Sequence, residues 1–433
     1  MRFEYTKAGS GLTYEIRNIV EIANRLIRYG VEVSWENIGD PVAKGEDLPR
    51  WFKDAVKGVL DSSKAYEYSP TKGVCSTREY IAAKNNALGG AQITKEDIIF
   101  FNGLGDAVSH TYAAMHVDAR VLMPEPTYST HFMAEVLHAS FPPNTYRLDP
   151  YNNWLPDLAE MERKAQQHKS IISILVINPD NPTGFVYSRE LLEEVVRIAR
   201  ENELFVIFDE IYNQIVYDGV ETCMLSQVIG DVPGISMKSI SKDVPWPGGR
   251  CGWIEVYNAG KDPMFDRFIN AIYRQKMAEV CSGTFPQISL PLIYEHPEYK
   301  GYLLERVNHY QKLAQTAVEE LGKSKYLNVT MPRGAFYLSA VFKEGVLNGK
   351  QKLPIKIAAI QDYIESVLSD KDPFDKRFTY YLLASTGVCV VPLTSFFTTT
   401  NGFRLVLLDC DSARFSQTVR KIAESVDAYV ESS

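Results

Sequence analysis

Short apolar segments alternate with longer amphipathic ones through the middle of this 433-residue chain, and this alternation constrains the fold most strongly. Residues 190–202 repeat apolar side chains at helical spacing behind Ser188, a candidate amino-terminal cap. The short segments are continuous runs of mostly β-branched and aromatic residues, typical of strands buried on both faces. They lie at residues 97–101, 120–123, 171–177 and 204–208. The pattern predicts an α/β fold with three layers, α/β/α, around a mostly parallel central sheet.

The rhythm changes after residue 321. Strand-like stretches at 336–342, 388–391 and 403–408 surround a charged helical region at 355–369. These stretches predict a smaller α+β domain, and an amphipathic helix expected at residues 13–29 can join it. We therefore expect a large domain at 61–315 and a discontinuous small domain made of residues 1–60 and 316–433.

Charge and composition exclude several classes of protein. Lys and Arg total 46 against 54 Asp and Glu, so the net charge is −8, and no basic tract is present to favour nucleic acid or an anionic membrane. Six cysteines are scattered without a CxxC pair, which predicts neither a metal site nor disulfides. The first residues, MRFEYTKAGSG, lack the apolar core of a signal peptide, and no apolar run is long enough to span a bilayer. We expect a soluble, cytoplasmic protein.

Polar residues that could carry chemistry follow the expected strands. The run at 204–208 ends in Asp209, and Tyr212 comes three residues later. An isolated Asp at a strand end most often caps the next helix, but ligands of open parallel sheets also bind beyond these ends. Asn181 lies in a Pro- and Gly-bearing turn after the strand at 171–177. Lys242 and Arg250 lie in a stretch rich in Ser, Pro and Gly, although a lone lysine is usually a surface group.

The order and spacing of these residues are far more specific than any one of them. Asn181, Asp209, Tyr212, Lys242 and Arg250 follow one another at offsets of 28, 3, 30 and 8. In this the chain resembles the fold-type-I aminotransferases that use pyridoxal 5′-phosphate, the aspartate/alanine/tyrosine aminotransferase group. The resemblance extends from the Asn-Ile-Gly-Asp-Pro segment at residue 37 to the Arg-Leu-Val-Leu-Leu segment at residue 404.

The resemblance implies a role for each residue around the cofactor ring. Lys242 would hold the cofactor as a Schiff base and later carry the proton between the substrate Cα and the cofactor. Asp209 would pair with the pyridinium nitrogen, so that the ring acts as an electron sink. Tyr212 and Asn181 would hydrogen-bond the 3-oxygen of the ring. Tyr128 matches the aromatic residue that stacks on the ring.

The resemblance also implies how the phosphate is held. A helix is expected to begin at Leu104 and Gly105, whose backbone amides would face the phosphate. Ser239, Ser241 and Arg250 match the remaining phosphate ligands of the same subunit. Tyr68 matches a tyrosine that reaches the cofactor of the neighbouring subunit. This match implies a homodimer with shared active sites.

Substrate recognition is implied at three positions. Arg404 matches the arginine that binds the α-carboxylate, Gly39 matches a glycine whose amide touches the same group, and Asn181 lies beside them. The expected reaction is a ping-pong exchange of an amino group between an L-amino acid and a 2-oxo acid through pyridoxal and pyridoxamine phosphate. The segments at 37–41 and 68–73 look more similar to the alanine (glutamate–pyruvate) branch, which favours alanine with 2-oxoglutarate.

Other activities of the same family share these residues. An aspartate or aromatic aminotransferase, or a pyridoxal-phosphate-dependent C–S lyase, would carry the same lysine, aspartate and tyrosine. Ala278 stands where aspartate-specific relatives often have an arginine, which weakens the aspartate alternative. Two departures from the family pattern, at residues 393–397 and in the long segment 341–376, bear on the size of the substrate rather than on the cofactor.

Overall fold

The structure, a computed structural model, describes residues 15–432. The helix expected at 13–29 is α2 (Glu15–Ile27), and residues 13–14 of the expected helix lie outside the described range. The first eleven residues, in which no signal peptide is expected, also lie outside it. No helix among residues 15–432 is both long enough and apolar enough to cross a bilayer.

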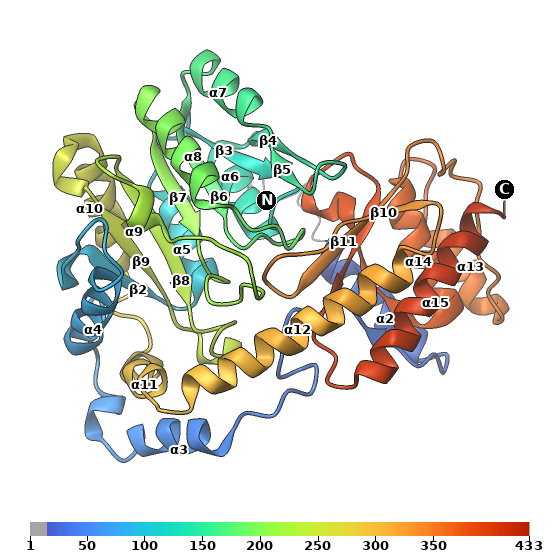
Figure 1. Cartoon of the computed structure of the whole chain (residues 1–433), viewed down its shortest axis with the longest axis horizontal. Helices are drawn as coiled ribbons and strands as arrows, with labels where there is room; N and C mark the ends of the chain where they lie inside the picture. Colours follow the sequence, from blue (N-terminus) through green and yellow to red (C-terminus); the bar gives the residue numbers. More distant parts are fainter. Residues whose placement is uncertain (1–14, 433) are drawn as a thin grey trace, which may run out of the picture.

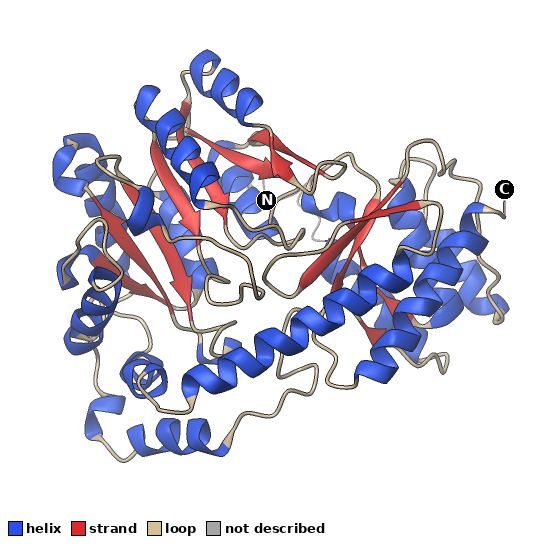
Figure 2. Cartoon of the chain, viewed as in Figure 1, coloured by secondary structure: helices blue, strands red, loops and turns tan. Residues whose placement is uncertain are grey.

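A central sheet of eight strands forms the middle of the larger part of the molecule (Figures 1 and 2). Its order is β2-β9-β8-β7-β6-β3-β4-β5. The strands are β2 (Ile98–Phe101), β3 (Arg120–Glu125), β4 (Asn144–Asp149), β5 (Leu155–Pro156), β6 (Ile171–Ile177), β7 (Phe205–Asp209), β8 (Gly234–Ser239) and β9 (Gly252–Tyr257). Strands β8, β7, β6, β3 and β4 are mutually parallel, whereas β9 and β5 run antiparallel to their neighbours. The prediction of a mostly parallel sheet is confirmed.

Helices cover both faces of this sheet. Alternate residues of each strand point to opposite sides, so each strand contributes apolar side chains to the core on both faces. In β7, Phe205 and Ile207 belong to the apolar core on one face, and Val206 and Phe208 to the core on the other. The first face is covered by α5 (Leu104–Ala113), α6 (Ser129–Ala139) and α10 (Pro263–Ala278). The second is covered by α3 (Arg50–Val59), α4 (Cys75–Asn86), α7 (Leu158–Gln167), α8 (Arg189–Glu201), α9 (Leu225–Val228) and α11 (Thr284–Tyr294). Ser188 caps α8 as predicted, since its Oγ accepts a hydrogen bond from the Leu191 amide at 3.3 Å.

A smaller antiparallel sheet lies beside the central one, as expected for a second α+β unit (Figure 2). Its order is β10 (Leu327–Val329), β11 (Tyr337–Phe342), β14 (Gly402–Val406) and β13 (Val391–Pro392). The helices that follow in this part are α13 (Ala358–Val367), α14 (Phe374–Thr386) and α15 (Ser412–Val430). Helix α12 (Tyr299–Leu321) runs from the edge of the larger part to the smaller sheet (Figure 1).

The strand predicted at 388–391 is in fact two short strands in different sheets. β12 (Val388–Cys389) pairs in parallel with β1 (Ser34–Trp35), and β13 turns to join β14. The pairing brings residues 34–35 against the last quarter of the chain. Gly387 makes this approach possible, because its φ is +77° and a Cβ there would lie 2.1 Å from the carbonyl oxygen of Glu32.

We predict that Gly387→Ala destabilises the protein by about 1–3 kcal/mol more than Gly345→Ala. Both glycines have a positive φ, +77° and +76°, so both substitutions incur the left-handed backbone penalty of about 1–2 kcal/mol. Only at Gly387 does the added methyl group meet backbone, because nothing lies within 4 Å of the position at Gly345. Urea unfolding of the two variants measures the difference, and equal losses would contradict the predicted steric contact.

Candidate active site

The parallel strands of the central sheet end at one edge, and the candidate site residues lie just beyond it. Asn181 follows β6, Asp209 closes β7, and Lys242 follows β8. They line one cavity of about 560 Å³ together with Tyr128, Tyr212, Ser241, Arg250 and the first residues of α5. Leu104 and Arg250, which are 146 positions apart in the sequence, therefore face a common space, as expected for the carboxyl edge of a parallel sheet.

Asp209 is buried and held in place by a residue that the sequence analysis missed. His131, on α6, places its Nε2 at 3.0 Å from Asp209 Oδ2 and is itself fully buried. Asp209 Oδ1 accepts a hydrogen bond from the Ile211 amide at 3.2 Å, which fixes the other side of the carboxylate. The alternative role of a simple helix cap does not describe this geometry, since a turn rather than a helix follows Asp209. The carboxylate faces the cavity on the α5 and α6 side of the sheet.

Lys242 lies in the cavity with its charge largely unneutralised. Its Nζ donates to the carbonyl oxygen of Gly39 at 2.8 Å and lies 5.6 Å from the centre of the Phe336 ring. Burial lowers its pKa to about 8, the negative charge of Asp40 opposes that shift, and the positive charge of Arg404 adds to it. A substantial fraction of the amine is therefore neutral near physiological pH, as a nucleophile or base requires.

Tyr212 is buried beside Lys242 and has a second tyrosine as its partner. Its hydroxyl lies 2.9 Å from that of Tyr337, which comes from β11 of the smaller sheet. Burial raises the pKa of Tyr212 well above its ordinary value. Tyr337 also explains Gly39, because a Cβ at that position would lie 2.3 Å from the Tyr337 hydroxyl oxygen. Nothing local in the sequence marks Tyr337, since 125 residues separate it from Tyr212.

The amino terminus of α5 forms a cradle of hydrogen-bond donors beside the cavity. Gly103 has a φ of +90° and turns the chain into the helix, so that the first amides, at Leu104 and Gly105, have no carbonyl one turn earlier. Arg250 packs against this turn, with Nη2 3.4 Å from the carbonyl oxygen of Asn102. A Cβ on Gly103 would lie 2.4 Å from the same Nη2. Amides, the Ser241 hydroxyl and a guanidinium on one wall fit a phosphate group.

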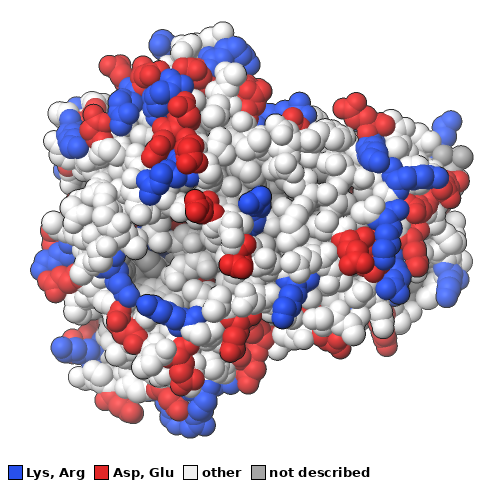
Figure 3. Space-filling model, viewed as in Figure 1, with Lys and Arg blue, Asp and Glu red and all other residues white. Residues whose placement is uncertain are grey.

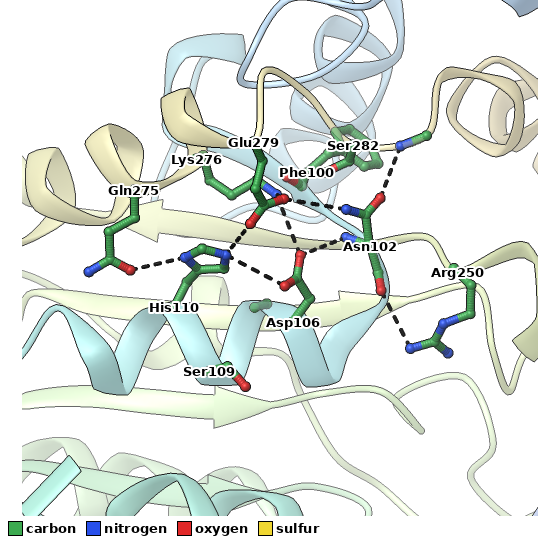
Figure 4. Close-up of polar contacts among 12 residues, drawn as sticks. Phe100, Asn102, Asp106, Ser109, His110, Arg250, Gln275, Lys276, Glu279 and Ser282 are labelled. Atoms are coloured by element: carbon green, nitrogen blue, oxygen red, sulfur yellow. Dashed lines mark hydrogen bonds and ion pairs between the residues drawn. The ribbon is translucent and has the colours of Figure 1, made fainter. Parts of the chain in front are cut away.

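A buried lysine supports the cradle from behind (Figure 4). Lys276 on α10 is fully buried and lies 3.4 Å from Asp106 Oδ2 and 2.5 Å from Glu279 Oε2. Asp106 in turn accepts a hydrogen bond from the Asn102 amide at 2.9 Å. The carboxylates of Asp106 and Glu279 and the ring of His110 have ligand atoms within 4.8 Å of one another, a spacing that could hold a metal ion. The Lys276 ammonium already lies between the two carboxylates and contacts both, so this cluster acts as a brace for the turn.

Arg404 lies in β14 and is buried where the two sheets meet. Its Nη1 donates to Asn181 Oδ1 at 3.2 Å, and its Nη2 donates to the carbonyl oxygen of Asn37 at 2.7 Å. The guanidinium stacks between the rings of Tyr337 and Phe396, with its Cζ 4.5 and 5.0 Å from their centres. A buried, oriented guanidinium of this kind fits the carboxylate of a small substrate.

Two expected phosphate ligands lie away from this cavity. Ser239 is one layer deeper, where its Oγ donates to the carbonyl oxygen of Cys251 and lies 2.8 Å from the Ser241 hydroxyl oxygen. Ser239 therefore orients Ser241 rather than lining the cavity. Tyr68 is 85% exposed and does not line the cavity of its own chain. Arg17 of α2, which the sequence analysis did not single out, does line it.

The fold and this site define a pyridoxal-phosphate-dependent transaminase. The chain belongs to the family of class I and II aminotransferases, whose sequence profile matches residues 37–422. It is 48% identical over 419 residues to an uncharacterized aminotransferase of Methanocaldococcus jannaschii, covering 97% of both chains. It is 34% identical over 250 residues to the glutamate-pyruvate aminotransferase of Escherichia coli, covering 57% of this chain and 60% of that one.

The solved structures agree with this assignment. An alanine aminotransferase from Pyrococcus furiosus matches 98% of this chain and 100% of its own, with a TM-score of 0.85 and 25% identity. An aminotransferase from Escherichia coli matches 99% of both chains with a TM-score of 0.84 and 24% identity, which shows the shared fold. Members of the family use pyridoxal phosphate, and the donors around the 560 Å³ cavity fit that group.

We predict that the Lys242 amine of the cofactor-free protein titrates with a midpoint near pH 8 and is charged below it. Asp40→Asn removes an attraction for the charged form, so the midpoint should fall by about half a unit. Competitive acetylation followed by mass spectrometry measures the neutral fraction at each pH. Asp47→Asn, which changes an exposed carboxylate of the same segment, is the control. A midpoint near 10.5 would contradict the effect of burial.

Proposed function

We propose that this transaminase exchanges an amino group between L-alanine and 2-oxoglutarate. The observation that carries the proposal is the position of Arg404, a buried carboxylate receptor bonded to Asn181 and enclosed by Tyr337 and Phe396. The two aromatic rings lie 4.5 and 5.0 Å from Arg404 Cζ, and such close neighbours favour a substrate with a small side chain. The similarity to the glutamate-pyruvate and alanine aminotransferases of other organisms supports the same choice.

Different residues of the cavity would hold different parts of the cofactor. Pyridoxal phosphate, when bound, supplies an aldehyde that condenses with amino groups and a ring that withdraws electrons from the substrate Cα. Arg250, Ser241 and the α5 amides would hold its phosphate. Asp209, fixed by His131, would keep a proton on the ring nitrogen, and Tyr128 would stack on the ring. Tyr212 and Asn181 would donate hydrogen bonds to the ring oxygen.

Lys242 would act twice in this reaction. Its amine would hold the cofactor until substrate displaces it, and the freed Nζ would then take the proton from the substrate Cα and return it at the neighbouring carbon of the cofactor. The lowered pKa of about 8 suits both steps, because only the neutral amine can attack a carbonyl or accept a proton. The amino group would pass from the donor amino acid, which leaves as a 2-oxo acid, to a second 2-oxo acid, which leaves as an amino acid.

We also propose that residues 1–60 and 316–433 form one small domain that closes over the substrate. The pairing of β1 with β12 and the bond from Arg404 to the Asn37 carbonyl support this arrangement, since both join the two ends of the chain. The proposed location is the cytoplasm, which suits the free thiols of all six cysteines.

We predict that L-alanine with 2-oxoglutarate gives the highest kcat/KM in a screen of amino donors against pyruvate and 2-oxoglutarate. Arg404→Lys should lower kcat/KM for every donor by about 100-fold, because an ammonium cannot bind a carboxylate through two parallel hydrogen bonds. Arg414→Lys, at an exposed arginine on α15, is the matched control. Faster turnover of aspartate or an aromatic amino acid would overturn the substrate proposal. Release of pyruvate and ammonia from cystathionine would indicate the C–S lyase.

The active site is further proposed to need a second copy of the chain. Tyr68 is 85% exposed although its neighbour Ser69 is buried, so the tyrosine side chain is held out from its own subunit. The adjacent segment is anchored, since Thr284 Oγ1 donates to the Glu67 carbonyl oxygen at 2.8 Å. An anchored, outward-facing tyrosine is suited to reach the phosphate of a cofactor in a partner subunit.

We predict that Tyr68→Phe weakens cofactor retention by about tenfold, the loss expected for one hydrogen bond to a charged group. Mixed dimers of Tyr68→Phe and Lys242→Ala chains should contain one site with both residues intact. They should therefore recover up to half of the wild-type activity per mixed dimer, whereas each variant alone stays impaired. A monomeric mass in sedimentation, or no recovery on mixing, would contradict a shared site.

A further inference from the structure

A second cavity lies on the other face of the central sheet from the cofactor cavity. It measures about 410 Å³, within the usual range for small-molecule sites, and its walls come from α4, β8, α12 and the segment 210–224. Figure 3 shows the surface hollowed on this side, over the region where α4, α11 and α12 meet in Figure 1. Successive residues point to opposite faces of the sheet, so Asp209 lines the cofactor cavity and Glu210 lines the second cavity.

The inner wall of this second cavity carries an excess of buried carboxylates. Glu210 and Glu255 are each 1% exposed and share a single cation. That cation is Lys238, whose Nζ lies 2.9 Å from Glu255 Oε2 and 3.6 Å from Glu210 Oε2. One ammonium cannot balance two carboxylates, so this part of the wall has a net negative charge when both are ionised. Burial acts against that state, because it raises the pKa of Glu210.

A third carboxylate, Asp243, lines the same cavity and is only 3% exposed. Its Oδ2 accepts hydrogen bonds from three neutral side chains, at 2.8 Å from Gln214, 2.8 Å from Tyr294 and 3.2 Å from Tyr299. Its Oδ1 is buried and accepts no hydrogen bond from a side chain among the described residues. Burial raises the pKa of Asp243, and the Tyr294 hydroxyl and the Val244 amide oppose that rise only in part, so a further donor at Oδ1 would stabilise the carboxylate.

The charge of Arg306 also opposes the rise that burial causes in the pKa of Asp243, but its hydrogen bond does not reach the carboxylate. Arg306 on α12 forms an ion pair with Glu46 at 2.5 Å. It donates to the backbone carbonyl of Asp243 rather than to its carboxylate. Asn85, also 3% exposed, supplies a second open polar atom, because its Nδ2 has no partner while its Oδ1 contacts the Tyr257 hydroxyl at 3.1 Å.

The rest of the lining is aromatic and aliphatic. Rings near a cavity with negative potential favour an organic cation, through the negative faces of their π systems. The rings are those of Tyr80, Trp253, Tyr294 and Tyr299, and the aliphatic lining comes from Leu88, Leu303, Leu304 and Val307. Two exposed lysines, Lys84 and Lys300, also line the cavity and would repel a cation, which favours one positive charge on the ligand over two.

We propose that this second cavity binds a small organic monocation, a protonated amine with an apolar or aromatic body, whose N–H group donates to Asp243 Oδ1. The aromatic and leucine side chains would enclose the body of the ligand. The proposal concerns a site separate from the cofactor cavity and does not depend on which amino acid is the substrate.

The experiment uses N,N-dimethyl-2-phenylethylamine as its probe. This tertiary amine is protonated at pH 7.5 and cannot condense with the aldehyde of the cofactor, so its binding is not confused with the transamination reaction. The neutral control is 2-phenylethanol, which keeps the ring and loses the charge. Titration calorimetry on the holoenzyme should show one amine bound per chain, at least tenfold more tightly than the alcohol.

Two variants locate the binding. Asp243→Asn keeps the shape of the side chain and should weaken amine binding by about 10- to 100-fold, while leaving that of the alcohol unchanged. Leu304→Trp alters a 59% exposed leucine of the lining and should block both ligands. Leu60→Trp, at an exposed leucine that lines neither cavity, is the matched control and should change nothing.

Several results would overturn the proposal. They are equal affinity for the amine and the alcohol, unchanged amine binding in Asp243→Asn, and full binding in Leu304→Trp. If Asp243→Asn does not fold, the comparison of the two ligands and the two tryptophan variants decide the question. Retention of the cofactor absorbance band in each variant shows that the proposed active site is intact.

Discussion

The parallel alignment of β6, β7 and β8 is the constraint on which the site depends. Parallel strands end at the same edge, so the turns that follow them bring Asn181, Asp209 and Lys242 to one cavity without any local sequence contact. The antiparallel partner β9 then returns the chain along β8 and places Arg250 beside the turn that begins α5. A change in the direction of any of these strands would disperse the site.

The charges of the cavity follow from this arrangement. The basic side chains of Lys242, Arg250 and Arg404 surround one space, in which Asp40 and Asp209 are the anions that act on Lys242. Without a bound anion these basic groups destabilise the folded protein, because like charges repel each other more strongly in a low dielectric. A phosphate and a substrate carboxylate reduce this repulsion, so ligand binding and protein stability are expected to rise together.

The sequence predicted the fold class, four central strands and the residues around one cavity, because buried parallel strands and the ordered polar motifs both leave local signals. It did not predict β4, β5, β8 and β9 as strands, because these segments are short or have polar residues between their apolar ones. His131, Tyr337 and Lys276 were missed for a different reason. Each acts through a partner distant in the sequence, and no spacing rule connects such pairs. The assigned roles of the site residues remain predictions.

The bond from Arg404 to the Asn37 carbonyl joins residues 367 positions apart, and this separation affects how the protein is made. At a translation rate of about 5–20 residues per second, the segment around Asn37 leaves the ribosome roughly 20–70 seconds before its partner exists. Every strand of the central sheet lies between residues 98 and 257, so that sheet can form in the interval. The proposed carboxylate receptor at Arg404 is therefore the last part of the site to assemble, and a nascent chain could bind cofactor before it can recognise substrate.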